Sequence, residues 1–568
     1  MDAWSTLDPL DYYKQELEPT HRRNVAEAFN ALLKQSGVDP KVNRAGVRKL
    51  KQLEAAVKEA EGVLSRLAAF GTVLNIVMTL CGLALAAHAA LLLLDCGPLF
   101  SGEICFWTAV AGVGAALLRF CWVRGALRSA VARQAELVVA KEKQHELLLR
   151  QVAPLNALIT WDTVDSLLGK SLPAYTPAPY VTEAALRELR DRYGWNGEPL
   201  RSASVTAVRS GRIAGNPFFF VRAKEVRMVP KKYGGSRTIH WTERKTDSDG
   251  RTRTVYRSQT LYASVEHAAP EFFEFSFVLY AHDAAPELVF SRSPSKYSGE
   301  TGSIFHRWGK RRETKRLEAF SRNLDDEYGF TMMANREFET LFHSTDRSDE
   351  AAFRLLFTPL AQQQMVRLLN DTDVGYGDDF SFVKDKKINI LLPEHLKAAR
   401  LSSDPAPYRG YDIDVMRRQF FDGITAELRH LWFGLAPLLC VPLYREQRSL
   451  SADCDGCVQP SGDWEHELQA NLMDLRAFRP QHCITDCILK SQTVAHSGSS
   501  SEAHIKAVGF TGCKRTDHVS VLASNGRSYD VPVPWTEYIT VRKTTSVRFT
   551  STPSAAYPRH VCADVGRR

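Results

Sequence analysis

Four cysteines near the C-terminus have the residue type and spacing that a structural zinc site requires. Cys454 and Cys457 form a C-x-x-C pair, and Cys483 and Cys487 form a C-x-x-x-C pair, with 25 residues between the pairs. Thiolates that are close in sequence can share one tetrahedral ion, so the spacing predicts a structural zinc and no other cofactor. Sparse glycines and basic residues around the pairs favour the alternative of inert thiols. A redox role is less favoured, because no thioredoxin-like unit precedes the C-x-x-C.

A second group of residues could bind an anion. The stretch FHRWGKRRETKR contains six cations within ten residues, and Glu313 is the only carboxylate among them. The cations are Arg307, Lys310, Arg311, Arg312, Lys315 and Arg316. A solvated helix face is the plain interpretation, and contact with anionic lipid headgroups is the next. Nucleic acid is the least expected partner, because Trp308 is the only aromatic residue inside the cluster and no recognised binding module surrounds it.

Motifs that would tie the chain to a reaction are missing from the sequence. It contains no P-loop, no G-x-S-x-G, no H-E-x-x-H and no dinucleotide fingerprint. We therefore expect a protein that is not an enzyme.

The bulk composition is that of a folded protein of several domains. The chain has 568 residues, 44% hydrophobic and 24% charged, which is enough for two to four domains. Its net charge of +8 is mild, and eleven cysteines are too few to staple a chain of this length. The first apolar run begins about seventy residues in, so we expect an anchor or core element and not a cleaved signal peptide.

The apolar run itself predicts a transmembrane hairpin. Residues 70–94 carry no formal charge, and 25 helical residues exceed the roughly 30 Å of a bilayer core. Residues 104–123 form the second span if Arg119 snorkels towards the headgroups, which places Trp107 and Trp122 near opposite interfaces. The alternative is a helical hairpin buried in a large soluble core.

Charge around the two spans predicts their orientation. The connector holds Asp95 and Glu103 and no cation, whereas the outer flanks are basic. The flanking cations are Lys49, Lys51, Lys58 and Arg66 before the hairpin, and Arg119, Arg124, Arg128 and Arg133 after it. The positive-inside rule then puts both flanks, and with them both termini, in the cytoplasm and the short connector outside. Cys96 and Cys105 either pair in the connector region or stay free.

Small residues four apart predict where the two spans touch. One stripe is Gly82, Ala86 and Ala90, and the other is Thr108, Gly112 and Ala116. Such stripes let helix backbones approach closely in lipid, within one chain or in a homo-oligomer.

Heptad-like patterns on both sides of the hairpin predict an antiparallel helical stalk. Before it, the seam consists of Leu50, Leu53, Val57, Ala60, Leu64 and Leu67. After it, a looser face consists of Leu127, Val131, Ala135 and Val138. The alternative is two independent surface helices.

The remainder predicts a mixed body of antiparallel strands and helices. Strand-like stretches occupy 217–229, 237–245, 252–267 and 271–282, with a turn at Gly250. The later stretch FSFVKDKKINILL reads as a strand pair with its turn at Asp385 and Lys386, and Asn525-Gly526 predicts another hairpin. We divide the chain into an N-terminal amphipathic segment at 1–43, the stalk and hairpin at 44–150, a β-rich domain at 151–300, an α+β domain at 301–445, and a β-rich cysteine-containing region at 446–568.

One segment resembles an uncharacterised family of bacterial membrane proteins, domain of unknown function 3137. The likeness covers about residues 311–394 and rests on these residues: the acidic-aromatic Glu337, Phe338 and Phe342, and the helix start Phe357-Thr358-Pro359. It implies two helices in the bacterial inner membrane ahead of a cytoplasmic mixed domain, and it implies no activity. The strands at 202–282 and everything after about residue 400 lie outside it.

Together these patterns predict a membrane-anchored α+β protein. A two-helix transmembrane hairpin continues into a coiled-coil stalk, and a mixed body is displayed in the cytoplasm as a scaffold. We expect membrane lipid and an unidentified protein as partners. The alternative is a membrane-tethered enzyme or zinc-dependent sensor that uses the C-terminal cysteines.

Overall fold

The computed structural model describes residues 8–93, 101–246, 251–299, 304–322, 330–446, 459–551 and 561–565. Two compact units account for them. The first unit consists of residues 1–26, 160–405 and 422–568, and the second of residues 27–159 and 406–421. The chain is therefore mixed α+β, with long helices in the second unit and antiparallel sheets in the first.

Long helices dominate the second unit. They are α4 (Pro40–Leu93), α5 (Gly102–Leu117), the π-helical turn η2 (Leu118–Val123) and α6 (Arg124–Leu158), with part of α3 (Glu18–Ser36) and of α13 (Ile413–Leu439). α4 and the continuous helical stretch from Gly102 to Leu158 are long and apolar enough to cross a membrane, by length and composition. In the most apolar 18-residue stretch of α4 no residue is buried, and in the corresponding stretch between Gly102 and Leu158 only 6% is buried. The described residues therefore do not form a helical pair buried in a soluble core.

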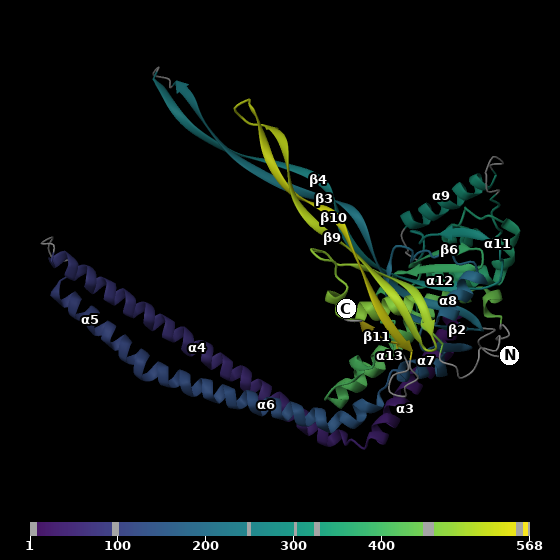
Figure 1. The fold of residues 1–568 in the computed structure, drawn as a ribbon, viewed down its shortest axis with the longest axis horizontal. Coiled ribbons are helices and arrows are strands. Elements are labelled where there is room, and N and C mark those ends of the chain that lie inside the picture. The colour runs from purple at the N-terminus through teal and green to yellow at the C-terminus, as the bar shows by residue number, and fades with distance from the viewer. Residues whose placement is uncertain are drawn as a thin grey trace. The chain divides into compact units, whose positions relative to one another are not determined.

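The two long helices of this unit lie along each other (Figure 1). In the stalk, Leu50 and Val57 of the predicted seam are buried, and Leu148 packs beside Gly46. On α6, Leu127 and Val138 of the predicted face are half-buried, whereas Val131 and Ala135 are exposed. Further along, Arg119 Nε donates to Asn75 Oδ1 at 3.2 Å.

The first unit contains two antiparallel sheets. The larger has the strand order β1-β2-β3-β4-β7-β6-β5 and the smaller has β11-β10-β9-β8. The strands of the larger sheet are β1 (Tyr175–Ala178), β2 (Ser204–Ile213), β3 (Asn216–Thr246), β4 (Thr252–Ala281), β5 (Val289–Arg292), β6 (Phe380–Asp385) and β7 (Ile388–Pro393). Those of the smaller sheet are β8 (Ile488–Ser497), β9 (Ser500–Leu522), β10 (Ser528–Ser551) and β11 (Val561–Val565).

Helices cover the sheets and close their cores. They are α2 (Pro9–Tyr12), α7 (Asp162–Ser171), α8 (Glu183–Asp191), α9 (Ile304–Ser321), α10 (Arg336–Phe342), α11 (Glu350–Leu356), α12 (Pro359–Asn370) and α14 (Asp463–Leu472). The π turn η1 (Tyr13–Leu17) and four 3₁₀ turns, η3 (Glu394–Lys397), η4 (Ala406–Tyr408), η5 (Pro442–Arg445) and η6 (Leu475–Ala477), complete the described elements. The core of the larger sheet includes Phe219 and Phe277, with Leu186 of α8 and Trp464 of α14.

Local signals in the sequence explain several of these elements. Thr358 accepts from the Ala361 N–H and Pro359 occupies the first turn, so α12 begins where the sequence predicts. Gly526 has φ +76° in the turn between β9 and β10, as the Asn-Gly pair predicts. Gly250, at the turn predicted between β3 and β4, lies outside the described residues. The apolar end of α13 is core, with Trp432 and Leu439 buried.

The four predicted strands between 217 and 282 are in fact two. β3 and β4 pair without interruption from Phe218↔Tyr280 to Thr246↔Thr252, through Gly234-Gly235 and Pro270. Glycine and proline weaken a strand locally but do not end it when the ladder continues on both sides. The distal part of this pair, residues 225–246 and 252–273, is called the first arm here.

β9 and β10 form a second long ribbon, and the two ribbons lie side by side (Figure 1). The part of this ribbon formed by residues 505–546 is called the second arm. Between the arms, Ile239 and Leu261 are buried with Ala523 and Val531. His267 stacks on Trp535 with 3.6 Å between ring centroids, and Asp517 contacts both side chains. An apolar strip and a stacked aromatic pair therefore hold the arms together.

We predict that Gly235→Ala weakens the contact between the arms. A Cβ at Gly235 would lie 2.1 Å from the Pro532 carbonyl oxygen, whereas nothing lies within 4 Å of one at Gly234. Overpacking of this kind costs about 1–3 kcal/mol, and Gly234→Ala, the matched control, should be neutral or slightly stabilising. Urea unfolding of the full chain in detergent measures both variants, and equal stabilities would contradict the observed packing.

Candidate functional site

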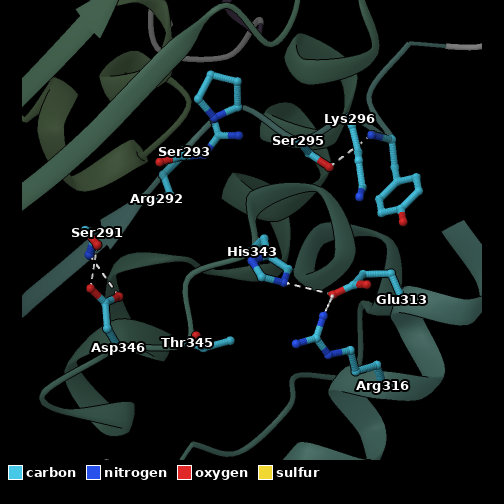
Figure 2. A pocket seen from close by; sticks show the side chains of 12 residues that line it. Ser291, Arg292, Ser293, Ser295, Lys296, Glu313, Arg316, His343, Thr345 and Asp346 are labelled. Atoms are coloured by element: carbon cyan, nitrogen blue, oxygen red, sulfur yellow. Dashed lines mark hydrogen bonds and ion pairs between the residues drawn. The ribbon is translucent and has the colours of Figure 1, made fainter. Parts of the chain in front are cut away.

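A cavity of about 560 Å³ opens beside β5 and α9 in the first unit (Figure 2). Its walls are the last residues of β5, the loop that follows, one side of α9 and the segment after α10. Hydroxyl groups come from Ser291, Ser293, Ser295 and Thr345. The wall therefore carries several hydroxyl groups, and it is built from segments that are distant in sequence.

A buried ion pair forms one side of this cavity. Arg292 contacts Asp378 at 2.7 Å, and both side chains are almost completely buried. The guanidinium also donates to the Phe342 and Phe380 carbonyl oxygens at 3.2 and 3.1 Å. Burial lowers the pKa of Arg292 and raises the pKa of Asp378, and the contact between the two opposes both shifts. Asp378 also accepts from the Ser295 N–H at 2.7 Å, which fixes the start of the loop.

Glu313 organises the other side of the cavity. Figure 2 shows its carboxylate between His343 and Arg316, at 3.2 and 3.8 Å. His343 ends α10 with a φ of +48°, a left-handed conformation that side chains rarely adopt. That conformation turns the chain at the point where the imidazole meets Glu313.

The lining groups suit an anionic ligand. Lys296 and Arg316 supply positive charge, and the hydroxyl groups of Ser293 and Ser295 supply hydrogen-bond donors. The two carboxylates of the lining are already engaged, since Glu313 contacts His343 and Arg316, while Asp346 accepts from the Ser291 N–H and hydroxyl at 3.0 and 2.5 Å. A phosphate or carboxylate of a partner is the kind of group that this cavity can accept.

The structure brings the six predicted cations together on α9. Lys310 pairs with Glu337 at 2.7 Å, and Arg316 belongs to the cavity. The other four are exposed, and no ion pair of theirs occurs among the described residues: Arg307, Arg311, Arg312 and Lys315. Trp308 lies beside them with 73% of its surface exposed. An exposed tryptophan among cations is typical of a lipid-headgroup contact, which stays a prediction.

Two of the four predicted zinc ligands lie together. The sulfur atoms of Cys483 and Cys487 are 3.7 Å apart, close to the roughly 3.8 Å between two thiolates of a tetrahedral zinc site with Zn–S bonds of about 2.3 Å. Gly509 packs behind them, where a Cβ would lie 2.5 Å from the Cys483 sulfur. Cys454 and Cys457 lie outside the described residues, and no cluster of three or more ligand-type side chains occurs within the described ranges.

The two thiols differ in acidity. Burial, and after it the neighbouring Cys483, raises the pKa of Cys487 to about 12. Burial acts in the same direction on Cys483, but contacts with Thr485 and Cys487 outweigh it and lower the pKa of that thiol. Cys483 is therefore the better thiolate of the pair. In the second unit Cys105 is a free thiol, and Cys96 lies outside the described residues.

The predicted small-residue stripes behave differently on the two apolar helices. Thr108, Gly112 and Ala116 lie on the less exposed face of α5, and a Cβ at Gly112 would lie 3.3 Å from Cys81. Gly82, Ala86 and Ala90 are exposed and do not form the contact within this chain. On α4 the contact passes through Leu74, Met78 and Cys81, and Gly82 lies about 100° further around the helix.

A Ser-His-Asp arrangement at the start of α14 was not predicted from the sequence. Ser461 Oγ lies 2.9 Å from His466 Nε2, and His466 Nδ1 lies 3.8 Å from Asp463 Oδ1. The spacing S-x-D-x-x-H at a helix start is the signal that could have revealed it. Ser461 and His466 are completely buried, and His466 stacks on Phe549. A buried serine cannot reach a substrate, so we assign this network to stability and not to catalysis.

Lys384 is the most perturbed cation in the first unit. It lies on β6, fully buried, and its ammonium donates to the Ala284 carbonyl oxygen at 3.1 Å and to that of Lys386 at 2.5 Å. Burial lowers its pKa to about 7, and Asp385 opposes the shift. This site therefore loses its charge near neutral pH.

We predict that Lys384→Met flattens the pH dependence of stability. Between pH 7 and about 10.5 the unfolded chain binds the Lys384 proton and the folded chain does not. The free energy of unfolding therefore rises with pH in this window, by up to about 1.4 kcal/mol per pH unit. Urea titrations from pH 7 to 10 should show this slope for the wild-type chain and for Lys386→Met, an exposed control. A slope unchanged in Lys384→Met would show that another group causes it.

The chain matches no protein-family model, no curated protein and no solved structure.

Proposed function

We propose that this chain is an integral protein of the bacterial inner membrane that crosses the bilayer twice and displays the first unit in the cytoplasm as a scaffold for a partner. The observation that carries the proposal is the exposed apolar surface of α4 and α5. Leu83 and Val113, for example, keep 63% and 61% of their surface exposed.

Water is a poor solvent for such a surface. Burying one large apolar side chain is worth about 1.5–3 kcal/mol, and α4, α5 and η2 leave more than ten of them exposed. Contiguous apolar patches of this size on a protein mark a lipid or partner contact. Lipid is the solvent that this surface fits, because each helix also satisfies its own backbone hydrogen bonds along the whole span.

Charge supports the orientation. The cations that flank the apolar windows, Lys49, Lys51 and Lys58 on α4 and Arg124 and Arg128 on α6, are exposed. Cations are retained on the cytoplasmic side, so both ends of the helical unit belong there.

A scaffold role is supported by how the buried polar groups of the first unit are used. The His466 network, Lys384 and the Arg292–Asp378 pair contact protein groups and are closed to solvent. The open features are the α9 cations and the cavity beside them, which suit recognition of an anionic group on a partner.

We predict that the full chain stays in the membrane pellet after carbonate extraction. A reporter inserted after Glu103 should be accessible from outside the inner membrane, and reporters at both termini should not. Replacing Leu80, Leu83 and Val113 with aspartate should release the chain, because charge at a span centre costs about 2.5–3.5 kcal/mol per residue. Replacing the stalk residues Val42, Val139 and Leu147 with aspartate is the matched control, since these side chains are also exposed. Release of the wild-type chain by carbonate would refute the anchor.

A second candidate function, a zinc-dependent sensor, is favoured by the 3.7 Å between the Cys483 and Cys487 sulfur atoms. These two residues would supply two of four thiolates, with Cys454 and Cys457 as the other two. A structural zinc of this kind couples metal binding to folding.

We predict about one zinc per chain by metal analysis of protein purified without chelator, if the sensor proposal holds. Cys483→Ser with Cys487→Ser should remove the metal and lower the stability of the smaller sheet, whereas Cys513→Ser should change neither, because that cysteine lies outside the pair. Absence of stoichiometric metal from the wild-type chain would leave these thiols as packing groups.

A further inference from the structure

Among the described residues, the first arm has a long backbone edge without a hydrogen-bonded neighbouring strand. β3 pairs with β2 only as far as Lys224, and β4 pairs with β7 only from Val278 to Ala281. Beyond these points, among the described residues, β3 and β4 pair only with each other. The outer edge of β3 therefore presents backbone N–H and C=O groups from Glu225 to Thr246. Proteins normally pair, cover or charge an edge of this length.

Charged side chains protect this edge from unwanted pairing. The stretch from Lys231 to Thr246 contains five cations and one carboxylate, and no proline: Lys231, Lys232, Arg237, Arg244 and Lys245 against Glu243. All five cations are exposed. By contrast, Pro532 and Pro534 interrupt the donors of β10 in the second arm.

The surplus charge of the whole protein is concentrated on the arms. Residues 225–246, 252–273 and 505–546 together contain 14 Lys and Arg against 7 Asp and Glu, while the entire chain has a net charge of +8. The rest of the chain is therefore almost neutral. Like charge keeps two copies of this edge from pairing with each other, and the same charge attracts a strand of opposite sign.

We propose that the outer edge of β3, from Lys231 to Thr246, takes an extended acidic segment of a partner protein as an added strand. Backbone hydrogen bonds supply affinity and cross-strand pairs between partner carboxylates and these cations supply specificity. This inference rests on the proposed scaffold role and names the chemistry of the partner.

Nucleic acid and bilayer surfaces fit the first arm less well. The arm beyond Lys231 exposes only Tyr256 and Tyr262 as large hydrophobic side chains among its described residues, and it has no exposed leucine, isoleucine or phenylalanine there to enter a bilayer. A free backbone edge is needed by neither ligand, whereas an added strand requires it.

The test uses the full chain in detergent and two synthetic peptides of ten residues with alternating glutamate and valine. One is unmodified, and the other carries N-methyl groups on alternate amides, which removes backbone donors on one edge without changing charge. Fluorescence anisotropy should show at least about tenfold weaker binding of the methylated peptide, since several backbone hydrogen bonds are lost. Equal binding of the two peptides would overturn strand addition.

Two variants with the same change in charge locate the site. Lys231, Lys232, Arg244 and Lys245 are replaced by glutamate in one, and Arg307, Arg311, Arg312 and Lys315 in the other. The first should lose binding of the unmodified peptide at least about tenfold and the second should keep it, because four exposed ion pairs account for a change of that size. Equal loss in both would assign the effect to overall charge and overturn the proposal.

Competing ligands complete the design. A 20-base-pair DNA duplex or vesicles of anionic lipid that bind the first arm more tightly than the peptide, and that lose binding in the arm variant alone, would also overturn it. The two peptides are compared on the wild-type chain, so the result stands even if an arm variant fails to fold. Peptide binding is measured in detergent and does not depend on insertion into a membrane. Absence of peptide binding can therefore be distinguished from release of the chain by carbonate or from an unexpected reporter orientation.

Discussion

The uninterrupted ladder between β3 and β4 is the constraint on which the first unit depends. One end of this ladder supplies Phe219 and Phe277 to the core beneath α8 and α14, and the other end is the first arm. Because both ends belong to the same two strands, the register that buries the phenylalanines also decides which side chains of the arm face the second arm. A register slip by one residue would therefore expose the core and, at the same time, separate the two arms.

Several buried guanidinium groups in the interior of the first unit have a carboxylate partner. Arg292 pairs with Asp378, Arg347 with Glu339, and Arg209 with Asp165, all with a nearly completely buried guanidinium. Aromatic rings surround two of these guanidinium groups, since Arg292 lies over Phe380 and Arg347 over Phe353. Removing one partner of such a pair costs more than the pair itself contributes, so these contacts fix one arrangement of α10, α11 and β5.

Local patterns in the sequence were sufficient for the features that one segment determines. The length of the uncharged apolar runs located α4 and α5. A Thr-Pro pair located the start of α12, and Asn525-Gly526 located the turn of the second arm. The arms were missed, because Gly234-Gly235 and Pro270 resemble strand ends until the partner strand is known. The cavity beside α9 was missed for a related reason, since β5, α9 and the residues after α10 come together only in the folded sheet.

The matched register of β3 and β4 makes the first arm modular in length. The four residues from Thr242 to Lys245 lie opposite the four from Arg253 to Tyr256. Deleting both groups would join Trp241 to Thr246 and Thr252 to Arg257, and every remaining cross-strand pair would keep its partner. Deleting an even number of residues from each strand also leaves every remaining side chain on its original face of the ribbon. Evolution or engineering can therefore shorten or lengthen the reach of this arm in steps of about 7 Å without disturbing the body that carries it.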